Sequence, residues 1–307
     1  DTTFTTASPL SLEVGSLVRI SSNQTFIDGY ANAGNKRGEI LKVKSVAGNT
    51  FTTYEEAYFS YLASSSLVAN KITPITPEIK GGNFIFWGDA SVISGVKTEY
   101  TEGLSIFGTS IDGAEDSGIQ VFYGYGGSIS NCVLSNSTSP SQGTSGVTWA
   151  SGYGVVLYSA TRDLRVHDCT FLNCRRGITG GGDYPAIFIT TDYNKAAGGF
   201  NGFGTHEPCF EWDVSHNDIV SMTGGGLVLR GQNIRANYNT IEAVASTGIV
   251  LRSYYNNSLG VNNVELCGNT IRDTGGNGIL IEGTADVGRV TGVAIRGGII
   301  EDCYFNC

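Results

Sequence analysis

A phrase that recurs along the chain constrains its fold more than any other feature. The segment NTIEAVASTGIVL, residues 239–251, returns as NTIRDTGGNGILI, residues 269–281. Each copy has an apolar residue two positions after Asn and a second apolar residue, preceded by Gly, eight positions later. The offset of eight separates four pairs of residues: Ile111 and Ile119, Ile219 and Leu227, Ile241 and Ile249, and Ile271 and Ile279. A constant offset in a recurring phrase indicates stacked copies of one structural unit.

The spacing of the copies predicts a parallel β-helix. Successive first apolar positions are 22 to 48 residues apart, and intervals near 22 recur. These positions are Phe84, Ile111, Leu134, Phe171, Ile219, Ile241, Ile271 and Ile299. Short alternating apolar segments at this period are typical of a coil with three strands. We therefore expect an all-β, right-handed parallel β-helix, with Asn217, Asn239 and Asn269 at its tight turns. The alternative, a β-sandwich, needs no constant offset.

Composition agrees with an all-β chain and excludes several partners. The 307 residues include 43 Gly, and 15% are charged against a usual ~25%. The net charge of −9 argues against nucleic acid as a partner. No run of 18 apolar residues is present, so we expect no membrane span. The seven Cys lack metal-ligand spacing, and we expect no metal and no cofactor.

The first part of the chain differs from the rest. Residues 1–75 contain LEVGSLVRISSN, GEILKVKSV and NTFTTYEEAYFSY, which predict a β-rich cap rich in hairpins. Residues 76–307 are expected to form the β-helix. The sequence begins at Asp1 without a Met or a signal peptide, which is typical of a fragment. Cys307 falls inside a coil, so we expect either that more sequence follows it in the natural protein or that it is a processed end.

The N-terminal sequence resembles that of a known family. GSLVRISSN, RGEILKVKSVAGNTFTTYEEAYFSY and ANKITPITPEIKGGNFIFWG, followed by coils, are similar to the segment that leads into the coils of bacteriophage tailspike and tail-fibre proteins. These proteins belong to the pectin-lyase-like β-helix superfamily. The resemblance implies a homotrimer on the phage tail of the virion, attached through sequence not present here. It also implies that the protein acts extracellularly, binding and cleaving bacterial surface polysaccharide such as capsule or O-antigen.

The resemblance transfers no catalytic residues. The Asp-His and Arg-x-Pro-x-x-Arg motifs of pectate lyases are missing, and so are the Asn-Thr-Asp, Asp-Asp and Gly-His-Gly signatures of polygalacturonases. A plant-polysaccharide enzyme is therefore the weakest of the functional alternatives.

Extra residues between the copies predict loops beside one strand. Insertions are expected at about 135–152, 180–212, 252–263 and 283–292. The last three would leave the same corner of successive coils and form a wall, and the first would rise on the other side. A strand face between two loop walls forms a groove that suits an extended ligand.

The floor of that groove is predicted from strand alternation. Three residues after each Gly-preceded apolar position lie Phe122, Tyr158, Arg230, Arg252 and Glu282, all pointing outward. The arginines would bind acidic sugars, because a guanidinium matches a carboxylate. The alternative is a solvated face crossed by salt bridges.

Two chemistries remain open at this groove. Hydrolysis needs two carboxylates, for which we expect Glu282 with Asp183 or Glu207, and Asp192 and Glu211 are the other acids of the 180–212 insertion. A lyase needs a base such as Tyr184, Tyr193, Lys195 or His206, together with cations. The residues expected to contact sugar are Arg230, Arg252, Tyr158, Trp149, Tyr254, Tyr184 and His206.

Three functional hypotheses follow from these observations. An endo-acting glycosidase is favoured over a polysaccharide lyase that acts on a uronate-containing glycan. A non-catalytic receptor-binding or adhesin β-helix is the alternative from another class. His167 and His216 are expected on another face, in structural roles.

Overall fold

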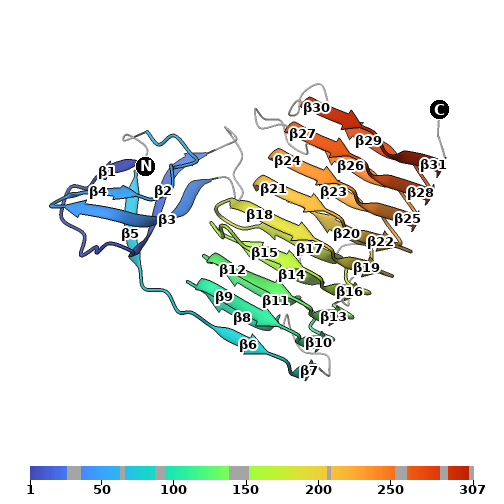
Figure 1. Ribbon diagram of the computed structural model, residues 1–307, viewed down its shortest axis with the longest axis horizontal. Helices are drawn as coiled ribbons and strands as arrows, with labels where there is room; N and C mark the ends of the chain where they lie inside the picture. Colours follow the sequence, from blue (N-terminus) through green and yellow to red (C-terminus); the bar gives the residue numbers. More distant parts are fainter. Residues whose placement is uncertain are drawn as a thin grey trace.

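The computed structural model describes residues 1–25, 36–62, 66–86, 94–137, 152–205, 209–252, 261–283 and 290–303. Every regular element within these ranges is a β-strand, as the sequence predicts. Figure 1 shows a small sheet at the N-terminal end beside a long stack of coils. The stack runs from β6 and β7 at one end to β30 and β31 at the other.

The N-terminal strands form one antiparallel sheet in the order β1-β4-β3-β2-β5. Its apolar core comprises Leu12, Val18, Ile20, Leu41, Val43 and Phe51. A tight turn at Gly48, with φ of 61°, joins β3 to β4 where the sequence reads AGNT. The strands are β1 (Thr3–Thr5), β2 (Leu17–Thr25), β3 (Lys36–Ala47), β4 (Thr50–Thr53) and β5 (Val68–Ile72).

The coils build three parallel sheets, which are called sheets I, II and III in chain order around a coil. Sheet I comprises β8 (Ser94–Glu99), β11 (Ser117–Phe122), β14 (Tyr153–Tyr158), β17 (Arg176–Gly181), β20 (Asn201–Gly204), β23 (Leu227–Leu229), β26 (Ile249–Arg252) and β29 (Ile279–Glu282). Its inward side chains and those of the other two sheets form one continuous apolar core.

Sheets II and III complete each coil. Sheet II comprises β6 (Glu78–Lys80), β9 (Glu102–Phe107), β12 (Tyr125–Ser130), β15 (Arg165–His167), β18 (Ala186–Asp192), β21 (Cys209–Ser215), β24 (Gln232–Asn237), β27 (Asn262–Cys267) and β30 (Thr291–Arg296). Sheet III comprises β7 (Asn83–Ile85), β10 (Ser110–Asp112), β13 (Val133–Ser135), β16 (Thr170–Leu172), β19 (Lys195–Ala197), β22 (Asp218–Val220), β25 (Thr240–Val244), β28 (Thr270–Thr274) and β31 (Ile299–Cys303).

The predicted stacking of apolar residues is confirmed over most of sheet III. Ile219 pairs with Ile241, and Ile241 pairs with Ile271. All three side chains are fully buried. The prediction for Ile299 is wrong, because Ile300 pairs with Ile271 and Ile299 pairs with Thr270. Gly298, with φ of 95°, occupies the turn position that Asn269 holds one coil earlier. The residue two positions after this turn, which stacks on Ile271, is therefore Ile300.

The large insertion predicted at 180–212 is wrong, because these residues form most of an additional coil. β18, β19 and β20 lie in this range and extend sheets II, III and I. Ala196 takes the anchor position, pairing with Phe171 on one side and Ile219 on the other. The interval of 48 residues is thus two coils. The signal was Gly202 followed by Phe203, which repeats the Gly-apolar phrase.

Two corner features explain the opening phrase. A Cβ on Gly226 would lie 2.5 Å from the carbonyl oxygen of Gly248 and 2.5 Å from a methyl carbon of Ile241. Gly before the apolar residue therefore lets neighbouring coils approach. At another corner, Asn194, Asn217, Asn239 and Asn269 form a buried ladder. The side-chain amide of Asn217 donates to Oδ1 of Asn239 at 3.0 Å.

The N-terminal sheet packs against the coils. Leu17, Ile40 and Ile72 contact Ala160 of the β-helix, and Phe59 contacts Ile187 and Phe210. This contact places a face of the small sheet beside the corner between sheets I and II.

Candidate functional site

The outward face of sheet I carries the predicted row of side chains. Phe122 pairs with Tyr158, and Arg252 pairs with Glu282, in the parallel register. Arg230 directly follows Leu229, which pairs with Leu251, so Arg230 and Arg252 occupy the same position on adjacent coils. Adjacent strands lie about 4.8 Å apart. The structure therefore confirms the register from which these residues were chosen.

Arg252 and Glu282 form an ion pair through Nε and Oε2. Their side chains are 32% and 41% exposed, so both groups remain accessible to a ligand. Arg230 is more deeply placed, at 7% exposed. The Thr205 hydroxyl accepts a hydrogen bond from the backbone N–H of Arg230 and donates one to its carbonyl oxygen, which fixes the backbone at this position. The register thus places two cations and one carboxylate at the same position of three adjacent coils.

The other end of the row is aromatic and also charged. Phe122 and Tyr158 stack with ring centroids 4.8 Å apart. Lys97 lies over Phe122, 5.1 Å from the ring centroid, and makes an ion pair with Glu99 at 2.7 Å. The sequence analysis did not name Lys97 and Glu99. The phrase SGV, which ends at Val96, matches the Gly-apolar signal and would have revealed them.

The middle of the same face is closed to solvent. The outward positions one residue after the apolar anchors include Val156, Val228 and Val250, and their exposed fractions are 0%, 8% and 8%. The row at the third position after each anchor is more open, because Phe122, Tyr158, Arg252 and Glu282 are partly exposed there, whereas Arg230 is buried.

Asp183 and Tyr184 lie away from Glu282. Asp183 follows β17, and four strand steps in sheet I separate β17 from β29. At about 4.8 Å a step, the separation is about 19 Å. Glycosidase carboxylates are ~5–9.5 Å apart, so Asp183 and Glu282 of one chain lie too far from each other to act as such a pair. The long-range docking of the N-terminal sheet explains the position of Tyr184, whose ring lies against Gly38.

Four predicted site residues lie outside the described residues, namely Glu207, His206, Trp149 and Tyr254. Most of the insertions predicted at 135–152, 252–263 and 283–292 also lies outside them.

The other acids and bases proposed for the large loop belong to strands or strand ends. Asp192 lies on β18 and pairs with Arg165 of sheet II. Glu211 lies on β21 and accepts a hydrogen bond from Asn233 at 2.7 Å. Tyr193 and Lys195 lie at the corner between sheets II and III. None of these four faces the row on sheet I.

The histidines have the structural surroundings that the sequence predicts. His216 stacks between Tyr193 and Tyr238, with centroid distances of 5.0 Å and 5.1 Å. Nδ1 of His167 lies 2.7 Å from Oδ2 of Asp168. Both histidines belong to the corner between sheets II and III, away from sheet I.

Burial changes the acidity of one candidate base. Burial, followed by the neighbouring Tyr153 and Asp116, raises the pKa of Tyr158 well above its ordinary value. A phenol with a raised pKa is a poor proton acceptor at neutral pH. Tyr158 therefore suits contact with a sugar ring better than proton abstraction.

The described residues contain no group of three His, Cys, Asp or Glu side chains arranged to hold a metal ion. The same residues also contain no helix that is long and apolar enough to cross a membrane.

Three stacked parallel sheets around one core, with an antiparallel sheet docked at one corner, define the molecule as a parallel β-helix protein. The family described as "Right handed beta helix region" matches residues 33–192, just over half of the chain. The chain belongs to this right-handed β-helix family. No curated protein matches the sequence.

The structure is similar to solved phage tailspikes. The tailspike gp61 of Pseudomonas phage phi297 aligns with a TM-score of 0.56 and 15% identity, covering 99% of this chain and 56% of that one. The tailspike gp49 of Pseudomonas phage LKA1 aligns with a TM-score of 0.46 and 12% identity, over 95% and 61% of the two chains. The Gp54 tailspike of Acinetobacter baumannii bacteriophage AP22, solved with A. baumannii capsular saccharide, gives 0.44 and 14%, over 99% and 60%. At 15% identity the similarity to the phi297 tailspike concerns the fold alone, and this chain spans less than two thirds of each of the three tailspikes.

Proposed function

We propose that this chain is part of a phage tailspike that binds bacterial surface polysaccharide on the outward face of sheet I and cleaves it by hydrolysis. The observation that carries the proposal is the Arg252–Glu282 ion pair on two adjacent strands of sheet I, with Arg230 at the same position of the coil before them. The fold shared with the phi297 tailspike supports the tailspike part of the proposal. The resemblance of the N-terminal sequence to tailspike proteins supports it as well. The site of action would be the bacterial surface, with the protein carried on the phage tail.

The two arginines favour an acidic glycan. A carboxylate on the sugar would bind the partly exposed Arg252, and Arg230 on the adjacent coil would add positive charge beside it. The stacked rings of Phe122 and Tyr158 would contact sugar rings further along the same row. A polysaccharide is long enough to span both groups.

The carboxylate and the phenol on this row of sheet I favour hydrolysis over elimination. Glu282 is a partly exposed carboxylate on the rigid strand β29, as a general acid or nucleophile requires. Tyr158 is the phenol on this row, and its raised pKa opposes a role as a base. We infer that Glu282 acts on the glycosidic bond while Arg252 holds it in place.

A second carboxylate must come from elsewhere than Asp183. Glu207, or an acid of a neighbouring chain, would complete the pair. A homotrimer, which the family resemblance implies, would supply the neighbouring chain. Light scattering at micromolar protein should give three times the mass of the chain, whereas a monomer mass would contradict the assembly.

Reaction products test the chemistry. The purified protein is incubated with capsular polysaccharides of candidate hosts, and new reducing ends and unsaturated uronate absorbance are recorded. Hydrolysis gives reducing ends alone, whereas a lyase gives both. Glu282→Gln should lower turnover at least ~100-fold and spare binding. Glu301→Gln is the matched control, because Glu301 forms a similar ion pair with Arg272 on sheet III.

The second candidate function is an adhesin that binds without cleavage. It is favoured by the engagement of Glu282 with Arg252 and by the distance to Asp183. Binding with neither product, in wild type and Glu282→Gln alike, would support it and contradict hydrolysis.

A further inference from the structure

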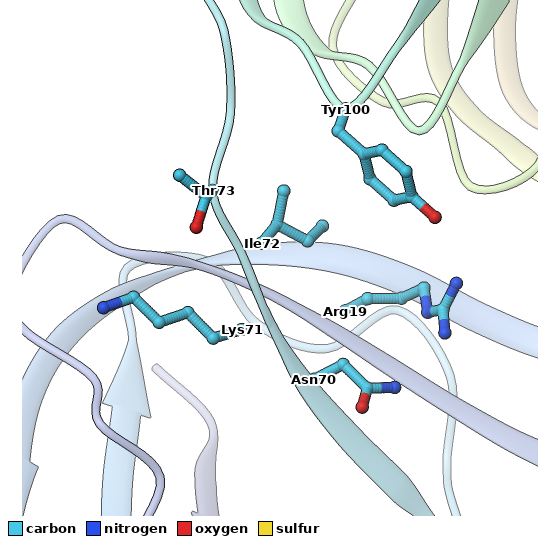
Figure 2. Close-up of a pocket in the computed structure, with 6 residues that line it drawn as sticks. All are labelled: Arg19, Asn70, Lys71, Ile72, Thr73 and Tyr100. Atoms are coloured by element: carbon cyan, nitrogen blue, oxygen red, sulfur yellow. The ribbon is translucent and has the colours of Figure 1, made fainter.

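A crevice of about 240 Å³ lies where the N-terminal sheet meets the first coils (Figure 2). One wall comes from β2 and β5 and the segment that follows β5, and the other comes from the turn after β8. Its lining residues are Arg19, Asn70, Lys71, Ile72, Thr73 and Tyr100. A volume of this size suits one small ligand rather than a polymer segment.

Arg19 is held in this crevice by the packing of the two sheets. It pairs with Asn70 across β2 and β5, so both side chains lie on the face that also carries Leu17 and Ile72. That face packs against the coils. The guanidinium carbon of Arg19 lies 5.2 Å from the ring centroid of Tyr123, a cation–π contact that fixes its position.

The charged side chains that line the crevice, Arg19 and Lys71, are both positive. No carboxylate lines it, and neither Arg19 nor Lys71 forms an ion pair with any residue that the structure describes. The Nε of Arg19 is buried and has no hydrogen-bond partner in the described part of the chain. Leaving such a donor unpaired is costly, and a ligand oxygen would satisfy it. In a protein of net charge −9, this arrangement selects an anion.

Lys71 plays a smaller part than Arg19. Its Nζ donates a hydrogen bond to the backbone oxygen of Ser11 at 2.7 Å. In Figure 2 its side chain extends away from Arg19, on the other side of the strand. Lys71 therefore adds positive potential, and Arg19 supplies the directed contact.

The remaining walls suit a polar ring better than a bare anion. Tyr100 is 39% exposed and stacks on Tyr123, with centroids 4.9 Å apart. Its ring and Ile72 offer apolar surface, while Asn70 and Thr73 offer neutral hydrogen-bonding groups. A sugar ring presents CH groups and hydroxyls to such walls.

We propose that this crevice binds one carboxylate-bearing sugar residue, with Arg19 holding the carboxylate. It is separate from the Arg252–Glu282 cluster, because Tyr100 follows β8 and seven strand steps, about 34 Å, separate β8 from β29. The choice of a sugar acid over another carboxylate rests on the proposed function. The anion site stands on the crevice alone.

Isothermal titration calorimetry with sodium glucuronate tests the proposal, with glucose and sodium acetate as reference ligands. Glucuronate should bind, glucose should not, and acetate should bind at least ~10-fold more weakly than glucuronate. Arg19→Gln should weaken glucuronate binding at least ~10-fold, and Tyr100→Ala should weaken it too. Arg235→Gln is the control, because Arg235 is a 62% exposed arginine elsewhere on the coils.

Each contrary result has a distinct meaning. Absence of glucuronate binding, or unchanged binding in Arg19→Gln, overturns the site. Equal affinities for acetate and glucuronate would mean that the crevice recognises the carboxylate and not the sugar, which overturns the proposed sugar ligand. Glucuronate binding lost in Arg252→Ala but kept in Arg19→Gln places the ligand on sheet I, which contradicts the crevice and favours the proposed function. If Arg19→Gln does not fold, the exposed Tyr100→Ala decides, and unchanged binding there overturns the proposal.

Discussion

Arg162 of the β-helix and Glu39 of the N-terminal sheet form an ion pair with 2.9 Å between Nη1 and Oε2. Their side chains are 5% and 0% exposed. Glu39 also accepts hydrogen bonds from the backbone N–H groups of Tyr58 and Phe59 and from the hydroxyl of Tyr61. This carboxylate therefore joins the two parts of the molecule at one buried point.

Removing the Glu39 carboxylate should destabilise the protein strongly. Glu39→Ala leaves the Arg162 guanidinium buried without this partner, a change that costs about 3–5 kcal/mol. Urea unfolding followed by circular dichroism measures the loss in unfolding free energy. Glu56→Ala, at an exposed position of the segment that follows β4, is the control. Equal midpoints for the two variants would contradict the assigned role.

The same carboxylate should make stability depend on pH. Burial raises the pKa of Glu39 above its ordinary value of 4.5, against the opposing hydrogen bonds and the charge of Arg162. The folded protein then binds a proton that the unfolded chain releases, so the Glu39 contribution to unfolding free energy decreases as pH rises from 4.5 through the raised pKa. Urea midpoints of wild type and Glu39→Gln, compared from pH 4 to 8, isolate this effect. A wild-type advantage that grows with pH would refute the raised pKa.

The asparagine ladder should contribute measurably to coil stability. Asn217 is 2% exposed, donates to Asn239 Oδ1 at 3.0 Å and to Thr191 O at 2.9 Å, and accepts from Asn194. Asn217→Ala leaves buried groups unpaired, at about 1–3 kcal/mol each. Thermal unfolding should show a clear drop in Tm, whereas Asn262→Ala, which removes an exposed side-chain bond to Thr291, should show little. Comparable shifts would argue against the ladder.

A methyl group at the glycine column should also be destabilising. Gly226→Ala places a Cβ 2.5 Å from the Gly248 carbonyl oxygen, a backbone atom that cannot move without displacing the next coil. Overpacking of this kind costs about 1–3 kcal/mol or more. Chemical unfolding measures the change, with Thr240→Ala on the exposed side of β25 as the control. A Gly226→Ala protein as stable as wild type would mean that the coils can separate here.

Loss of the Arg252 guanidinium should weaken binding of an acidic polysaccharide. The expected cost is about 1.5–3 kcal/mol for one charge-assisted hydrogen bond, or roughly a 10-fold to 100-fold rise in Kd. Arg272→Ala is a matched control, because Arg272 pairs with Glu301 on sheet III as Arg252 pairs with Glu282 on sheet I. Surface plasmon resonance on immobilised capsule compares the two. Equal losses would show a general charge effect and would contradict the assigned row.

The sequence alone determined the coil because each coil repeats the same local requirements. Glycine is needed where neighbouring coils approach at Gly226 and Gly248, and asparagine is needed where a turn amide is bonded at Asn217 and Asn239. These needs recur at fixed offsets, so the stacking of Ile219, Ile241 and Ile271 followed from the spacing. The alignment of Arg252 with Glu282 followed from the same register.

Tertiary packing decided what the repeats did not encode. The coil at Ala196 was missed because its anchor is a small residue, and the neighbouring core positions hold Phe171 and Phe203, whose rings meet edge to face at 5.6 Å. A small residue in one sheet is thus compensated by large residues at neighbouring core positions, and the sequence separation between such residues is not constant. The positions of Asp183 and Tyr184 likewise depend on the N-terminal sheet, which contacts the coils through residues more than a hundred positions away. Repetition is local and can be predicted from the sequence, whereas docking and core filling depend on contacts that only the folded chain brings together.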